Sequence, residues 1–141
     1  MADAGLADIF LPYNIMGQAK LERLMRLARR VKLSVTADSA FTVKGYSEAT
    51  GPANIELPVL VEFDTGGKRC GVQSPHEAAG LARLIAHSPG LRFGGLTHPC
   101  NAQSDGCVRE VKSLLKADGI AVERVAMAGR PTCGRRTFIP N

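Results

Sequence analysis

The feature that most constrains the fold is an apolar run that stops at a glycine-containing turn. Residues 59–72 have the sequence VLVEFDTGGKRCGV, in which residues 59–63 are almost wholly apolar and residues 64–67 carry the turn signal. Such a run bounded by glycines suits a strand buried on both faces, as in a parallel sheet. Ligands of parallel sheets bind beyond the carboxyl ends of the strands. The sequence therefore places Asp64, Thr65 and Arg69 where a functional site is expected.

Composition and cysteine spacing limit the classes of protein to which this chain can belong. The chain has 141 residues, of which 45% are hydrophobic and 22% charged, as in an ordinary single globular domain. No apolar stretch approaches the ~20 residues of a membrane span, and the N-terminus carries no secretory signal. The four cysteines form no CxxC pair and no metal-ligand spacing. We therefore expect one domain over residues 1–141, free thiols, a cytoplasmic location and no metal site.

The net charge of +5 raises the question of nucleic-acid binding. Most of the excess lies in six basic residues, which are Lys20, Arg23, Arg26, Arg29, Arg30 and Lys32. They fall between apolar residues that repeat at helical spacing, so they form the solvated face of an amphipathic helix. No aromatic residues interleave with them as a base-stacking surface requires. We predict neither a nucleic-acid partner nor a membrane partner.

Strand and helix patterns alternate along the chain. Strands are expected at residues 8–12, 33–36, 59–63, 91–96 and 122–127. Helices are expected at residues 18–30, from Asp38-Ser39 to Tyr46, at residues 75–87, and around residues 108–115 with an end at Gly119. The clearest start is Ser74-Pro75, where Glu77 follows three residues after the cap. Residues 51–54 are expected as a loop and residues 128–141 as a loop-like tail.

Five strands with helices between them predict an α/β fold of parallel βα units with right-handed crossovers. One architecture with this count is a doubly wound, flavodoxin-like sheet, which the length favours. The other is part of a (β/α)8 TIM barrel, whose complete form needs ~250 residues. A flavodoxin-like domain would also need a phosphate-binding loop after its first strand. Residues 12–17 offer a single glycine for that purpose.

Three segments carry a resemblance to a known family. They are DIFLPYNIMGQAKLERLMRLARRVKLSVTADS, LPVLVEFDTGGKRCGVQSPHEAAGLARLIAHSPGLRFGGLTHP and GIAVERVAMAGRP. These segments resemble consecutive βα units of the D-threonine aldolase / D-serine deaminase-like branch of the alanine racemase-type pyridoxal-phosphate enzymes, most strongly over residues 5–99. The resemblance implies a partial (β/α)8 barrel of about five units. It also implies a lyase for D-amino acids, of the aldolase or of the D-serine/hydroxyaspartate dehydratase type.

The resemblance also implies which residues bind the cofactor, pyridoxal phosphate. The arginine after the DTG turn points toward the ring hydroxyl in these enzymes, and Arg69 occupies that place; the alternative is a surface ion pair. Gly129 and Arg130 lie in the phosphate-binding segment. Tyr13 and Asn14, just past the first strand, are expected to line the pocket.

The remaining polar side chains are expected to have roles other than cofactor binding, or no chemical role. His98 is the candidate catalytic residue, because an imidazole at this edge can move protons near neutral pH. Asp64 and Thr65 are expected to shape the turn by local hydrogen bonds. His76 and His87 are expected on the outer face of a helix, without a chemical role.

Two departures from the family pattern affect the expected activity. The family attaches its cofactor to a lysine on the first barrel strand, and none of the six lysines here occupies that place. The phosphate-binding segment, AMAGRP, has lost the usual hydroxyl side chains. We therefore expect an internal fragment of a barrel enzyme that is inactive alone and associates through open sheet edges, for example as a homodimer. The alternative is a non-catalytic pyridoxal-phosphate-binding module or a flavodoxin-like binding module.

Overall fold

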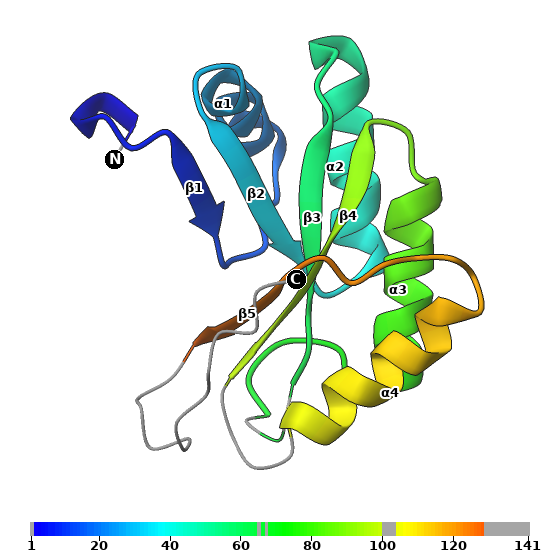
Figure 1. Cartoon of the computed structure of the whole chain (residues 1–141). Coiled ribbons are helices and arrows are strands. Elements are labelled where there is room, and N and C mark those ends of the chain that lie inside the picture. Colours follow the sequence, from blue (N-terminus) through cyan, green and yellow to red (C-terminus); the bar gives the residue numbers. More distant parts are fainter. Residues whose placement is uncertain (1, 65, 67, 100–103, 129–141) are drawn as a thin grey trace.

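The computed structural model describes residues 2–64, 66, 68–99 and 104–128. Within these residues the chain forms one curled sheet flanked by helices (Figure 1). Its strands are β1 (Asp8–Leu11), β2 (Lys32–Ala37), β3 (Leu57–Glu62), β4 (Leu91–Pro99) and β5 (Val125–Ala128). The helices are a 3₁₀ turn η1 (Ala2–Ala4), then α1 (Gln18–Ala28), α2 (Ala40–Ala53), α3 (Pro75–His87) and α4 (Ser104–Lys116).

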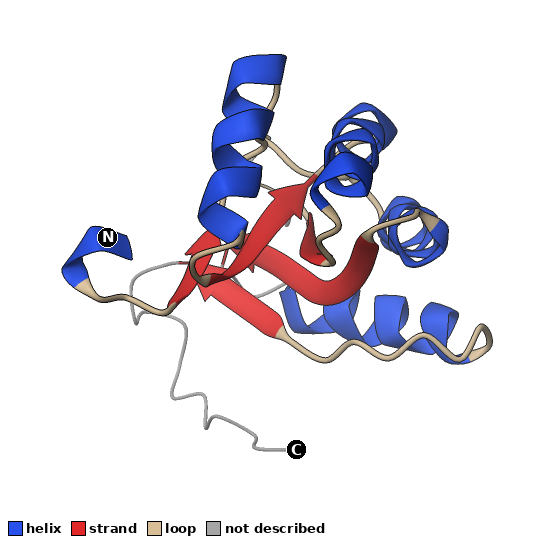
Figure 2. Cartoon of the chain, turned by 90° about the horizontal axis from the view of Figure 1, so that it is seen from above, coloured by secondary structure: helices blue, strands red, loops and turns tan. Residues whose placement is uncertain are grey.

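The strand order confirms the partial barrel and excludes the alternative fold. The sheet runs β1-β2-β3-β4-β5, and each neighbouring pair is parallel. A flavodoxin-like sheet would place β1 between β2 and β3. Sequential order is instead that of a (β/α)8 barrel. Figure 2 shows α1 to α4 around the outer, convex side of the curled sheet. Each of the described helices is too short or too polar to cross a bilayer.

The two faces of the sheet differ in character. Leu33 and Val35 on β2, like Val59 and Val61 on β3, are buried in the core that the helices cover. Their neighbours along each strand face the concave side, because side chains alternate along a strand. These inner residues include polar groups: Ser34, Thr36 and Glu62 are all buried. The inner face is therefore buried but partly polar.

Helix α2 is longer than the sequence predicted. Residues 51–54 were expected as a loop, yet Gly51, Pro52 and Ala53 form the last turn of α2, and Asn54 ends it with a left-handed backbone. Tertiary contacts stabilise this extension: Thr50 is 1% exposed, and the Ser47 hydroxyl donates to the carbonyl of Pro89 at 2.8 Å. Packing thus overrides the weak helix propensity of glycine and proline.

Strand β4 also extends past its predicted end at Leu96, through Pro99. Its register with β3 shifts by one residue between Val59 and Leu60, where Gly94 and Gly95 face that step. Gly95 has φ +123, and a Cβ there would lie 2.0 Å from the carbonyl oxygen of Arg124. This bulge lets the chain entering β5 approach closely. Ala128, expected in the tail, is the last residue of β5, and residues 129–141 lie outside the described residues.

Candidate functional site at the carboxyl edge of the sheet

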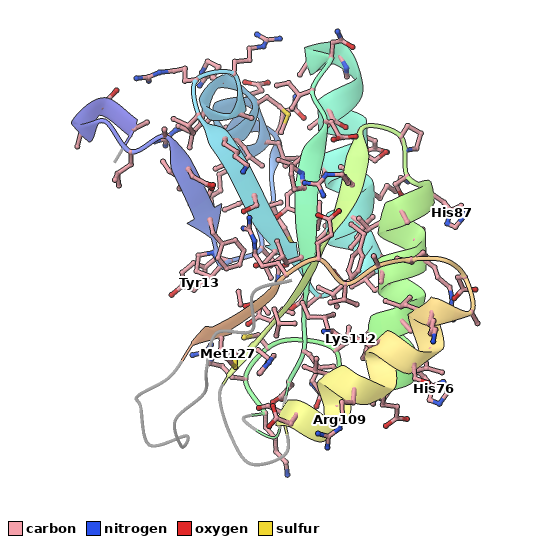
Figure 3. All side chains as sticks on the ribbon, in the orientation of Figure 1. Tyr13, His76, His87, Arg109, Lys112 and Met127 are labelled. Atoms are coloured by element: carbon pink, nitrogen blue, oxygen red, sulfur yellow. The ribbon has the colours of Figure 1, made fainter. Side chains whose placement is uncertain are left out.

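The carboxyl ends of the strands gather at one edge because every strand pair is parallel. This edge carries the β1–α1 loop with Tyr13 and Asn14, the β3–α3 loop with Arg69, and the end of β4 with His98. Tyr13 lies beyond the tip of β1, whereas His76 and His87 project from α3 away from the sheet (Figure 3). The structure therefore brings the described candidate residues to one edge and leaves those two histidines on the outer helix, where they were expected.

Tyr46, which sequence reasoning missed, fixes the β1–α1 loop. Its side chain is fully buried. Its hydroxyl donates to the carbonyl of Thr36 at 3.0 Å and accepts from the backbone N–H of Ile15 at 2.9 Å. The loop that carries Tyr13 and Asn14 is thereby tied to the end of β2. Tyr13 remains 73% exposed, and the Asn14 Oδ1 is buried without a partner among the described residues.

Asp64 shapes the β3–α3 turn, as predicted. Its Oδ1 accepts from the N–H of Gly66 at 2.9 Å, and its own N–H donates to the carbonyl of Val72 at 2.9 Å. Gly71 has φ +100, and a Cβ there would lie 2.7 Å from the Asp64 nitrogen. This residue must therefore be glycine for the loop to close against β3. Thr65, assigned the same role, lies outside the described residues.

Arg69 follows this turn and is hydrogen-bonded to its neighbour. Its Nε donates to the Cys70 Sγ at 3.3 Å, and the Cys70 thiol donates to the Glu62 Oε1 at 2.9 Å. Cys70 and, to a smaller degree, Glu62 and Tyr13 raise the pKa of Arg69. The guanidinium is exposed and makes no ion pair with a described residue. The alternative interpretation, a surface ion pair, thus has no partner in the described part of the chain.

His98 lies inside β4 rather than after it. The imidazole is 3% exposed, and the residue pairs in register with Met127 of β5. The sequence ended this strand at Leu96 because Thr97-His98-Pro99 carries no apolar alternation, whereas pairing with β5 extends the strand. A catalytic role for His98 stays a prediction. Gly129 and Arg130, assigned to the phosphate, lie outside the described residues.

Sequence reasoning also missed Glu62 and Cys70. Glu62 is the single charged residue in the run 59–63, and a carboxylate inside a buried strand is itself a signal of a special role. Its hydrogen bond to Cys70 has no sequence signal, because it depends on the geometry of the returning loop. In the described part of the chain, no three His, Cys, Asp or Glu side chains are grouped to hold an ion.

None of the lysines lies at the carboxyl end of a described strand. Lys20, Lys44, Lys112 and Lys116 are on helices, and Lys32 opens β2. Lys68 lies in the β3–α3 loop with φ +49. It is therefore the lysine nearest in sequence to Arg69.

Two observations fit an additional ligand at this edge. The buried Asn14 Oδ1 and Thr36 Oγ1 have no hydrogen-bond partner among the described residues, although buried polar atoms usually have one. Arg69 presents an exposed guanidinium that forms no ion pair with a described residue. A ligand that carries both a hydrogen-bond donor, for the Asn14 Oδ1, and an anionic oxygen, for Arg69, would satisfy both. These residues fit a phosphorylated, hydroxyl-bearing cofactor such as pyridoxal phosphate, and no lysine lies at the carboxyl end of a described strand.

Comparison with known proteins finds one matching family model and several similar proteins. The sequence model of the family described as "Alanine racemase, N-terminal domain" matches residues 6–132. D-threonine aldolase of Arthrobacter sp. is 40% identical over 93 residues, which are 66% of this chain and 24% of that protein. 3-Hydroxy-D-aspartate aldolase of Paracoccus denitrificans (strain Pd 1222) is 28% identical over 144 aligned residues, 91% of this chain and 37% of that protein.

The crystal structure of D-threonine aldolase from Filomicrobium marinum superposes with a TM-score of 0.86 at 30% identity. The match covers 90% of this chain and 38% of that chain. The matches thus span 24% to 38% of the length of these relatives.

Proposed function

The chain belongs to the alanine racemase N-terminal domain family, and from this membership we propose that it forms the cofactor-facing part of a pyridoxal-phosphate-dependent lyase for D-amino acids. The curated relatives are named for D-threonine and for 3-hydroxy-D-aspartate, which both carry a hydroxyl on the β-carbon. We propose this substrate class, with an aldol-type cleavage favoured over dehydration by the names of these relatives. The observation that carries the proposal is the exposed Arg69 at the carboxyl edge, where Tyr13 is near enough to contribute to its raised pKa.

Each candidate residue has a proposed task. Arg69 provides a fixed positive charge for the cofactor's ring oxygen, because a planar guanidinium binds an anionic oxygen well. Tyr13 and Asn14 line the pocket, and Asn14 supplies its unpartnered amide oxygen to a donor on the ligand. A ring nitrogen of His98 accepts or returns a proton. Gly129 and Arg130 bind phosphate. When bound, pyridoxal phosphate supplies the electron sink for bond cleavage next to the amino group.

The placement of the lysines favours a second candidate, a non-catalytic pyridoxal-phosphate-binding module. Since no lysine lies at the carboxyl end of a described strand, such a module would bind the cofactor non-covalently and would not turn over substrate. Incubation with pyridoxal phosphate and D-threonine, followed by assay for glycine and acetaldehyde, separates the two candidates. Product formation supports the lyase, and saturable binding without product supports the binding module.

The test of cofactor binding compares Arg69→Ala with Arg109→Ala, which removes an exposed arginine from the outer helix α4. A hydrogen bond to a charged group contributes about 1.5–3 kcal/mol, so Arg69→Ala should weaken pyridoxal phosphate binding about tenfold to a hundredfold. Arg109→Ala should bind like the parent chain. Equilibrium dialysis measures both affinities, and equal affinities for the two variants would contradict the assignment of Arg69.

Borohydride reduction with peptide mapping tests the mode of binding. We expect no lysine to be labelled stoichiometrically. Labelling confined to Lys68, and lost in Lys68→Ala, would show covalent attachment in the β3–α3 loop and would overturn the non-covalent part of the proposal.

We also propose a cytoplasmic location. Cys70 and Cys107 are free thiols in the structure, and free thiols are typical of reducing compartments. Fractionation of the native host, with the chain detected by antibody, tests this location.

A further inference from the structure

A chain of two hydrogen bonds connects the exposed Arg69 with the buried interior of β3. The Arg69 Nε donates to the Cys70 Sγ, and the Cys70 thiol donates to the Glu62 Oε1. Arg69 and Cys70 belong to the loop, whereas Glu62 is the last residue of β3. The side chain of Arg69 is therefore connected to β3 through the sulfur atom of Cys70.

Glu62 is a buried carboxylate that needs this contact. Its side chain faces the concave side of the sheet, and the residue is 8% exposed. It makes no ion pair with any described lysine or arginine. A buried carboxylate without donors is costly, so the thiol proton of Cys70 stabilises it directly. Arg69, one step further along, places a positive charge near the same carboxylate.

The Cys70 thiol has the properties of a hydrogen-bonding group between Glu62 and Arg69 rather than those of a nucleophile. The hydrogen bond to Glu62, with burial next, raises the pKa of Cys70, although the hydrogen bond from Arg69 opposes this. The sulfur therefore keeps its proton at neutral pH. A protonated thiol can donate to Glu62 and accept from Arg69 at once, whereas reactive cysteines are thiolates of lowered pKa.

The bond from Cys70 uses the Nε of Arg69 and leaves the two Nη groups at the other end of the planar guanidinium. No described residue is bonded to those Nη groups. We propose that Cys70, oriented by Glu62, is the positioning residue that fixes the guanidinium of Arg69 for an anionic oxygen at the carboxyl edge. That this oxygen belongs to pyridoxal phosphate rests on the proposed function above; the positioning itself does not.

The first test observes Arg69 without any cofactor. In ¹H–¹⁵N NMR spectra, the Arg69 Nε–H signal is assigned by its loss in Arg69→Lys. Cys70→Ala removes the acceptor and should shift this signal and speed its exchange with water. Cys70→Ser keeps a donor and an acceptor and should retain the protection in part. Cys107→Ala, which removes the other described free thiol, should leave the signal unchanged. An Arg69 signal that is unaffected in Cys70→Ala would overturn the proposal.

The second test measures the thiol. Alkylation with iodoacetamide is followed for each cysteine by peptide mapping, with Cys107 as the internal reference. Glu62→Gln removes the carboxylate that raises the pKa of Cys70, so alkylation of Cys70 relative to Cys107 should accelerate severalfold. An unchanged ratio would show that Glu62 does not orient the thiol and would overturn that part of the proposal.

Cofactor binding provides the final comparison. Because Cys70 acts on the cofactor only through Arg69, Cys70→Ala should weaken pyridoxal phosphate binding roughly twofold to tenfold, less than Arg69→Ala, with Cys70→Ser restoring part of the loss. If the parent chain does not bind pyridoxal phosphate at all, the proposed function fails. The NMR and alkylation results then still decide whether Cys70 positions Arg69.

Discussion

At the scale of single residues, the hydroxyl of Tyr46 connects three segments that are far apart in the sequence. It joins α2, the end of β2 and the loop after β1, with Ile15 lying 31 positions away along the chain. Burial, with a smaller contribution from Asp38, raises the pKa of Tyr46 to about 12. The neutral phenol is thus the form that the folded structure stabilises.

This raised pKa can be measured directly, because Tyr46 and Tyr13 are the two tyrosines of the chain and there is no tryptophan. In Tyr13→Phe, the ultraviolet absorbance change of phenol ionisation should come from Tyr46 alone, with a midpoint near pH 12. Since an unfolded tyrosine titrates near ~10, the stability contributed by the neutral phenol should be complete below about pH 10 and be lost as the pH rises toward 12. A midpoint near 10 in a chain that is still folded would contradict the buried position.

Tyr46→Phe removes the hydroxyl and leaves the ring. The variant should lose about 1–3 kcal/mol of unfolding free energy, because the Ile15 N–H loses its acceptor and the Thr36 carbonyl its donor. Urea unfolding followed by circular dichroism measures the loss. Tyr13→Phe is the matched control, since Tyr13 is 73% exposed and should change stability little. Equal losses in the two variants would show that the hydroxyl of Tyr46 does not hold the loop.

The candidate site was predictable from the sequence where a residue has a positional signal. Arg69 and Asp64 follow an apolar strand, so their place at the carboxyl edge could be expected, and the Asp64 turn is observed. Tyr46, Cys70 and Glu62 act through hydrogen bonds between segments. Neither apolar periodicity nor turn signals contain that information. The sequence shows Tyr46 in a weak helix pattern and Glu62 in a strand. It does not show which groups these two side chains bond to.

At the scale of elements, the accuracy of prediction depended on whether local signals or tertiary packing decide the boundary. Helix α3 begins where Ser74 caps Pro75, with the Glu77 N–H bonded to the Ser74 hydroxyl at 3.2 Å. All of these signals are local, and the predicted helix 75–87 is confirmed. Helix α2 has weak local signals and extends because Thr50 and Ser47 contact Pro89, which no sequence window contains.

Two glycines allow opposite predictions for the same substitution. Gly80 lies in the middle of α3, with nothing within 4 Å of an added Cβ. Gly80→Ala should stabilise the chain by about 0.5–1 kcal/mol, because alanine loses less conformational freedom on helix formation. Gly95→Ala should destabilise it by at least about 2 kcal/mol, because the left-handed backbone and the Arg124 carbonyl both exclude a methyl group. Thermal unfolding of both variants measures the signs, and a destabilised Gly80→Ala or a neutral Gly95→Ala would contradict the structure.

At the scale of the whole molecule, the described sheet has two edge strands, β1 and β5. An open edge presents unpaired N–H and C=O groups and favours association with another strand. The Lys32 N–H donates to the Ala7 carbonyl, so the backbone of Ala7 faces β2. Because backbone direction alternates along a strand, the backbone groups of Asp8 and Phe10 face the open side.

Phe10→Pro should therefore reduce association without breaking the β1–β2 ladder, because it removes an N–H that points outward. Light scattering after size-exclusion chromatography should show a concentration-dependent increase in mass for the parent chain and a smaller increase for Phe10→Pro. Phe10→Ala, which keeps the N–H, separates the backbone effect from the loss of the ring. A strictly monomeric parent chain at every concentration would contradict association through the edge.

The sequential strand order has a consequence for the order of folding during synthesis. Each strand pairs with the strand that precedes it in the chain, so each βα unit meets its docking surface as soon as it has been translated. Short separations between paired segments keep the entropy of loop closure low, and they are associated with rapid folding. Within the described sheet, strands from β1 to β5 can thus be added in succession on the ribosome, and at each stage β1 and the most recently added strand form the two edges.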